Sequence, residues 1–151
     1  MNVLVVDDER EYRVLVANYL TDQGWTVFLA GDGEEGLNTL YREKIDIIVS
    51  DIYMPVMDGL KFHRTVRNNP KFASMPFLFV SAFDDPHSLE AVKNPKIEGF
   101  SRKGRPVSDL KLWIQYLTTP VEKRPAVPPG GDARSSPSAW RHDNPRPARR
   151  R

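Results

Sequence analysis

Short apolar runs alternate with segments of helical periodicity along the first 118 residues. The runs are rich in β-branched residues, which is typical of strands that are covered on both faces. Between them, apolar residues recur at helical spacing, so each run precedes a predicted amphipathic helix. The predicted strands are residues 3–6, 25–30, 45–49, 76–80 and 97–101, and the predicted helices are residues 9–22, 34–43, 60–67, 87–93 and 106–117.

The repeated order of strand and helix predicts one α/β domain. Central strands that are apolar throughout need helices on both faces, which is the arrangement of parallel strands joined by right-handed crossovers. Residues 1–118 are therefore predicted to form a five-stranded parallel sheet with five helices.

Composition changes near residue 118. From there onward 8 Lys and Arg residues face 3 Asp and Glu residues, a net charge of +5, whereas residues 1–117 hold 14 and 17, a net charge of −3. The same segment holds 7 of the 13 prolines and few large apolar residues. It cannot bury enough surface to offset the entropy of ordering, so residues 119–151 are predicted to be a disordered tail, either a linker or an added sequence.

Charge and cysteine content restrict the class of protein. The basic residues gather in the tail, so association with nucleic acid, through residues such as Arg149–Arg151, is only a weaker alternative.

The chain has no cysteine, which excludes disulfides and fits a reducing compartment. The amino terminus becomes acidic at Asp7, too early for a signal peptide, and no apolar run could span a membrane. We expect a soluble, cytoplasmic protein.

Chemically useful side chains follow four of the predicted strands: Asp7-Asp8, Asp51, Ser81 and Lys103. The carboxyl ends of parallel strands meet at one edge of the sheet, where α/β proteins bind ligands. Three neighbouring carboxylates repel one another and need a cation, and oxygen ligands without His or Cys favour Mg²⁺. A hydroxyl and a lysine beside them suit a phosphoryl group. The pattern predicts phosphoryl transfer to a carboxylate.

Four motifs resemble, in order and spacing, those of the receiver domain of two-component response regulators. They are Asp7-Asp8, the run DIYMPVMDG from Asp51 to Gly59, Ser81-Ala82 and Lys103. The resemblance covers residues 1 to about 118. It implies a flavodoxin-like, doubly wound sheet of strand order 2-1-3-4-5. It also implies a signalling module that catalyses its own phosphorylation and dephosphorylation.

The resemblance implies partners as well as a fold. Asp51 would accept a phosphoryl group from a sensor histidine kinase or a histidine phosphotransfer protein. Output would pass through contact with a downstream protein that the sequence does not identify. An alternative is a receiver fragment of a larger regulator or hybrid kinase.

Roles carried over from the family complete the predicted site. Asp8, Asp51 and the backbone carbonyl of Tyr53 would bind Mg²⁺, or Mn²⁺ in its place, and Asp7 would help through water. Ser81 and Lys103 would contact the phosphoryl oxygens. Phe100, together with the Ser81 hydroxyl, would form the switch that senses phosphorylation.

Structural explanations compete with several of these roles. Asp7-Asp8 suits a helix cap, Ser81 suits a hydroxyl that satisfies backbone groups, and Phe100 suits a core residue. Asp58 is predicted to be a helix N-cap rather than a metal ligand.

One residue departs from the family pattern. Gly104 follows Lys103, where the family has a proline after a cis peptide bond. A cis bond without proline costs about 2.5 to 4 kcal/mol, so we expect a trans bond and a displaced loop. The alternative pair Arg105-Pro106 would shift the last helix, and arginine is a poor substitute for a compact ammonium.

Two aromatic residues are predicted to set the lifetime of the phosphorylated state. Tyr53 and Phe83 stand two residues after the acceptor and two after the hydroxyl, where the family places the side chains that border the path of the hydrolytic water. Both are bulky, and neither can orient a water, so slow hydrolysis is expected.

The first helix is expected to turn Leu15 inward and Val14 outward, toward a partner.

Overall fold

A computed structural model of the chain describes residues 1–83 and 86–129. The greater part of the predicted tail, residues 130–151, lies outside the described residues. No helix of the described part is both long and apolar enough to cross a bilayer.

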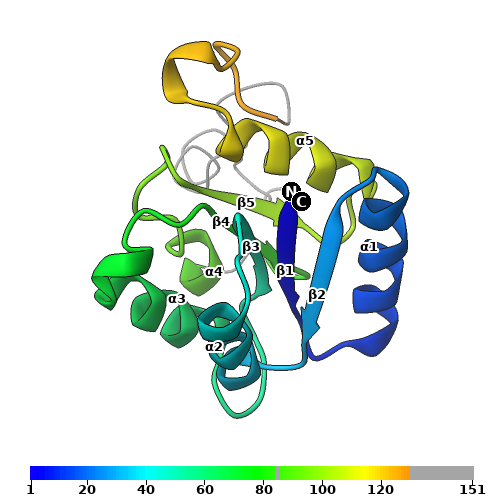
Figure 1. Cartoon of the computed structure of the whole chain (residues 1–151), viewed down its shortest axis with the longest axis vertical. Coiled ribbons are helices and arrows are strands. Elements are labelled where there is room, and N and C mark those ends of the chain that lie inside the picture. Colours follow the sequence, from blue (N-terminus) through cyan, green and yellow to red (C-terminus); the bar gives the residue numbers. More distant parts are fainter. Residues whose placement is uncertain (84–85, 130–151) are drawn as a thin grey trace, which may run out of the picture.

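A parallel sheet of strand order β2-β1-β3-β4-β5 forms the centre of the domain (Figure 1). Every neighbouring pair is parallel, as the apolar runs predicted. This confirms the flavodoxin-like, doubly wound sheet. The strands are β1 (Asn2–Val6), β2 (Thr26–Ala30), β3 (Ile47–Asp51), β4 (Phe77–Ser81) and β5 (Glu98–Arg102).

Helices cover both faces of the sheet (Figure 1). Strand residues alternate between two apolar clusters: Val3 and Val5 pack with α1 and α5, and Leu4 and Val6 pack with α2 and α3. Both sets of strand residues are buried, which explains why the strands are apolar throughout. The helices are α1 (Arg10–Asp22), α2 (Gly33–Arg42), α3 (Gly59–Asn68), α4 (Pro86–Leu89) and α5 (Ser108–Thr118).

Helix α4 is shorter than the predicted helix at residues 87–93. The carboxylate of Glu98 accepts hydrogen bonds from the backbone N–H groups of Lys93 and Asn94, at 2.7 and 2.9 Å. These amides therefore do not donate to carbonyls four residues earlier, so the helix cannot continue through Lys93. A side chain just beyond the predicted helix thus overrides the local helical pattern.

The orientation predicted for Leu15 is wrong. Its side chain is 53% exposed, and that of Val14 is 41% exposed, so both apolar side chains face outward from α1. Helix α1 buries only Val16 and Leu20 completely. It packs on β1 and β2 at one edge of the sheet, so the buried stripe is narrow.

The segment between β3 and α3 folds tightly back on the end of β3. Asp58 caps α3 by accepting a hydrogen bond from the N–H of Lys61 at 2.8 Å, as predicted. A Cβ atom at Gly59 would lie 2.0 Å from the carbonyl oxygen of Asp51. Only glycine fits there, and the N–H of Gly59 donates to the carbonyl of Ile52 at 2.7 Å.

Residues just after α5 fold back on the helix. The guanidinium of Arg124 donates to the carbonyls of Thr119, Leu117 and Lys96, at 2.8, 3.2 and 2.8 Å. It also lies 4.9 Å from the centre of the Tyr116 ring. The carbonyls at the end of α5 thereby gain a cationic partner. Disorder over the rest of the tail stays a prediction.

Val56 has an unusual backbone conformation, with φ at +68°. A β-branched side chain is strained there, at a cost of order 1 kcal/mol or more, whereas Asn tolerates this region. Because Val56 is 74% exposed, its replacement removes little packing. We predict that Val56→Asn raises the free energy of unfolding by about 1 kcal/mol in urea denaturation. Val56→Thr keeps the branched carbon and should gain little; an equal gain in both variants would contradict the backbone explanation.

Candidate functional site

Three carboxylates meet at the carboxyl edge of the sheet. Val6 of β1 pairs with Ser50 of β3, so the residues that follow, Asp7 and Asp51, leave adjacent strands side by side. One oxygen each from Asp7, Asp8 and Asp51 lies within 4.8 Å of the others. The structure thus brings the three acids together as the strand ends predicted.

The Asp51 carboxylate is 7% exposed and has two different partners. Its Oδ1 accepts a hydrogen bond from the N–H of Ile52 at 2.7 Å, and its Oδ2 accepts one from the Lys103 ammonium at 3.1 Å. A backbone group thus fixes one oxygen, while the second is held by a long side chain that can move.

Lys103 joins the acids to one another. Its Nζ lies 2.8 Å from Asp7 Oδ2 and 3.1 Å from both Asp51 Oδ2 and Glu9 Oε1. It also stands 4.7 Å from the centre of the Tyr12 ring. Glu9 is the first residue of the helix predicted at residues 9–22. Glu9 is the N-cap of α1, but its side chain makes no capping hydrogen bond. Its carboxylate forms an ion pair with Lys103 instead. The only sequence signal for Glu9 was its place beside Asp7-Asp8.

The loop after β5 positions Lys103 without a cis bond. The N–H of Lys103 donates to the carbonyl of Ser81 at 3.1 Å, so the backbone continues along β4 before it turns away. The described residues contain no cis peptide bond, which agrees with the expected trans bond at Gly104. The alternative residue, Arg105, points elsewhere and binds Asp109 through its Nε at 2.8 Å.

Burial and charge shift the protonation of this cluster. Burial, reinforced by the charge of Asp7, raises the pKa of Asp51 to about 6, although Lys103 opposes the shift. Burial likewise raises the pKa of Asp7. Burial alone would lower the pKa of Lys103, but its bond to Asp7 and the charge of Asp51 outweigh that effect and raise it. Lys103 therefore stays charged at neutral pH.

Ser81 and Phe100 are both fully enclosed. The Ser81 hydroxyl accepts a hydrogen bond from the N–H of Phe83 at 3.2 Å, so the backbone explanation foreseen for this residue describes its contact here. Phe100 pairs in register with Phe79 and belongs to the apolar cluster under α2 and α3. Its aromatic ring is a core side chain in this state.

Tyr53 and Phe83 contact each other next to the site. Their ring centres are 5.4 Å apart in an edge-to-face arrangement. The hydroxyl of Ser88 in α4 donates to the Tyr53 hydroxyl at 3.4 Å, while Phe83 is 57% exposed. The pair is therefore anchored to α4 through Tyr53.

The donor set fits a hard divalent cation. It consists of carboxylate oxygens, without sulfur or nitrogen, and Mg²⁺ prefers such ligands. Counting Glu9, four acids face the single ammonium of Lys103, so the cluster keeps a large negative charge. Asp7 Oδ2 is buried and, apart from its ion pair with Lys103, makes no well-formed hydrogen bond. The cluster therefore has both the charge and the acceptor capacity to hold Mg²⁺.

Comparison with known proteins gives the same class. Residues 3–115 match the family described as the response regulator receiver domain. Chemotaxis protein CheV3 of Helicobacter pylori is 36% identical over 101 residues, which are 60% of this chain and 32% of CheV3. The chain thus spans about a third of that relative's length.

Two solved structures show the same fold. The first is chemotaxis protein CheY4 of Vibrio cholerae, with a TM-score of 0.71, 31% identity and coverage of 77% of this chain and 97% of that one. The second is the response regulator protein TrrA of Thermotoga maritima in complex with Mg²⁺-BeF, with a TM-score of 0.64, 28% identity and coverage of 77% and 97%.

The doubly wound parallel sheet and the acid cluster at its carboxyl edge agree with the family match. The chain belongs to the response regulator receiver domain family. It is a receiver domain of the two-component type, as its motifs indicated.

The raised pKa of Asp51 predicts a stability effect in metal-free buffer. A folded-state pKa near 6, above the usual 3.8, favours the protonated folded form, so this group's stabilisation is present below pH 4 and is lost as pH rises through 6. At pH 7.5 the neutral Asp51→Asn variant should be more stable than the wild type by of order 2 kcal/mol in urea denaturation with chelator.

The gain of Asp51→Asn should shrink as pH falls toward 4. Asp22→Asn removes an exposed carboxylate at the end of α1 and serves as the matched control, with a gain at pH 7.5 well below that of Asp51→Asn. A pH-independent gain in Asp51→Asn would contradict the burial explanation.

Proposed function

We propose that Asp51 is the phosphorylated residue and that the acid cluster holds Mg²⁺. The supporting observation is the convergence of Asp51 with Asp7, Asp8 and Lys103 at one edge of the sheet. A nucleophile, a metal-binding acid pair and a compact cation are the components that phosphoryl transfer to a carboxylate requires. Asp8, Asp51 and the carbonyl of Tyr53 would hold the ion, and Asp7 would assist through water.

In the proposed reaction an oxygen of Asp51 attacks the phosphorus of a phosphohistidine. The phosphorus–nitrogen bond breaks, and its electron pair returns to the imidazole. The ring leaves neutral if its other nitrogen carries a proton; otherwise it takes a proton from solvent. Mg²⁺, when bound, neutralises charge on the phosphoryl oxygens. The Lys103 ammonium already stands 3.1 Å from Asp51 and pairs with the new phosphoryl group. The Ser81 hydroxyl exchanges its bond with the N–H of Phe83 for a bond to that group. Movement of Ser81 in turn opens a path for Phe100 to rotate.

The phosphodonor is a sensor histidine kinase or a histidine phosphotransfer protein, in the cytoplasm. Val14 and Leu15 form an exposed apolar strip on α1, the helix that follows Asp7-Asp8, and this strip is the proposed docking surface for the donor. The signal then passes to a downstream protein by contact. Because the chain spans about a third of CheV3, the second proposal is that it acts as the receiver part of a larger regulator. The basic residues Arg149–Arg151 lie outside the described residues, so nothing in the structure favours nucleic acid.

Labelling by acetyl phosphate tests the acceptor. Incubation with acetyl phosphate and Mg²⁺ should add one phosphoryl group to the wild type, read by intact-protein mass spectrometry. Asp51→Asn should gain none, and chelation of Mg²⁺ should reduce labelling of the wild type by ~10-fold or more. Ser81→Ala should fold normally and label more slowly. Labelling of Asp51→Asn to the wild-type extent would place the phosphoryl group elsewhere.

We also propose that Tyr53 and Phe83 make the phosphorylated state long-lived. The rings contact each other, and neither can position a water for attack on the phosphorus. In excess Mg²⁺, Tyr53→Asn and Phe83→Glu should lose the label ~10-fold faster than the wild type. Tyr41→Asn removes an exposed tyrosine on α2, away from the site, and should decay like the wild type. Equal decay in all four proteins would show that the two rings do not control hydrolysis.

A further inference from the structure

A hollow of about 370 Å³ lies at the edge of the sheet opposite to Asp51. Its walls are the second half of α3, the turn at Ala73 before β4 and the segment from Lys93 to Glu98 that enters β5. These segments meet at the amino ends of β4 and β5, whereas Asp51 is the last residue at the carboxyl end of β3. The hollow is therefore separate from the phosphorylation site. Its volume lies within the range of small-ligand pockets.

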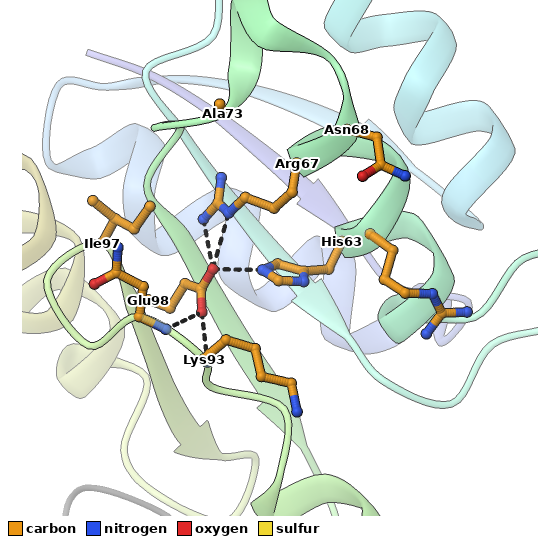
Figure 2. Close-up of a pocket in the computed structure, with 9 residues that line it drawn as sticks. His63, Arg67, Asn68, Ala73, Lys93, Ile97 and Glu98 are labelled. Atoms are coloured by element: carbon orange, nitrogen blue, oxygen red, sulfur yellow. Dashed lines mark hydrogen bonds and ion pairs between the residues drawn. The ribbon is translucent and has the colours of Figure 1, made fainter.

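The one acidic side chain in the wall, Glu98, is already fully occupied (Figure 2). Its Oε1 accepts from the N–H groups of Lys93 and Asn94, and its Oε2 lies 2.9 Å from the Arg67 Nε and 2.5 Å from the His63 Nε2. Burial would raise the pKa of Glu98, but these donors outweigh it and lower the pKa to about 2. Glu98 is thus a charge-paired wall component with no acceptor left for a cationic ligand.

Basic side chains dominate the rest of the wall. Arg64, Arg67 and Lys93 line the hollow against the single carboxylate of Glu98, so the lining charge is positive. Within residues 1–83 and 86–129, the side chains of Arg64 and Lys93 have no hydrogen-bond or ion-pair partner. Both lie at the exposed rim. Figure 2 shows that the Lys93 ammonium extends away from Glu98.

The sequence around the hollow is unusual for this domain. Residues 59–83 contain four Lys and Arg residues and no Asp or Glu, although residues 1–117 as a whole carry a net charge of −3. Two of these four cations, Arg64 and Arg67, line the hollow. Two amides, Asn68 and Asn94, add neutral hydrogen-bond donors and acceptors to the wall, and Ile97 with Ala73 adds apolar surface.

We propose that this hollow binds a small phosphate-bearing molecule, with the phosphate between Arg64 and Lys93. Two unpaired cations match a dianionic phosphate, and a guanidinium can contact two of its oxygens at once. The amides and the apolar surface suit a sugar or comparable organic group attached to that phosphate. The ligand would contact the segment that leads into β5, the strand of Phe100 and, one residue beyond its end, Lys103.

Ribose 5-phosphate is a suitable probe, with ribose as its uncharged control. Titration into the full chain in Mg²⁺-free buffer with chelator should give saturable changes in the amide NMR signals of residues 67–73 and 93–98. Signals around Asp8, Asp51 and Lys103 should change little. The double variant Arg64→Gln/Lys93→Gln should bind ~10-fold or more weakly, because it loses two charge-assisted contacts.

A matched double variant separates this site from general attraction. Lys61→Gln/Lys96→Gln removes the same charge from exposed positions on α3 and on the same loop, outside the lining, and should bind like the wild type. Equal weakening in both double variants at constant ionic strength would overturn the proposal. Changes centred on Asp51, equal binding of ribose, or no saturable binding would also overturn it. Thermal melts of the free variants should coincide with that of the wild type, since none of these side chains supports the fold.

Discussion

The negative charge gathered at the carboxyl edge of the sheet is the constraint on which the site depends. Asp7 and Asp51 are buried, and both stand against the single ammonium of Lys103. Burial raises the pKa of both carboxyl groups, reinforced at Asp51 by the charge of Asp7 and at Asp7 by that of Asp8, while the charges of Asp7 and Asp51 keep Lys103 protonated. Lys103 thus holds the acid cluster together in the metal-free state, and a divalent cation would take over part of that function.

Much of the fold and the site could be predicted because the signals are local. Buried strands can be recognised in the sequence as apolar runs, and the positions of their ends determine which side chains meet. Asp7, Asp8 and Asp51 could therefore be placed together from the sequence alone. Lys103 was less secure because Gly104 breaks the family pattern. The structure supports Lys103 over Arg105, since the amide bond to Ser81 aims the lysine at the acids while Arg105 pairs with Asp109.

The missed features depend on contacts made outside the predicted element. Glu98 captures the amides of Lys93 and Asn94, yet nothing within residues 87–93 shows that it will do so. Leu15 fits a helical apolar stripe, but a helix at the sheet's edge has less surface to cover, so Leu15 remains outside. In the sequence, Glu9 resembles an ordinary acid at a helix start. Its ion pair with Lys103, which is far away in the sequence, forms only in the folded domain. Hydrophobic periodicity describes one helix or strand at a time, whereas each of these outcomes depends on a contact with a residue outside that element.

The short α4 also has a mechanical consequence. The loop that replaces its last turns is fastened at two points: Glu98 holds the amides of Lys93 and Asn94, and Arg124 holds the carbonyl of Lys96. A longer helix would move as one rigid body when its first turn moved. Here the helix ends at Leu89 and the segment beyond it is anchored, so a displacement that starts beside Tyr53 and Ser88 would not be carried as far. The surface that such a displacement would change is therefore compact and lies next to Asp51.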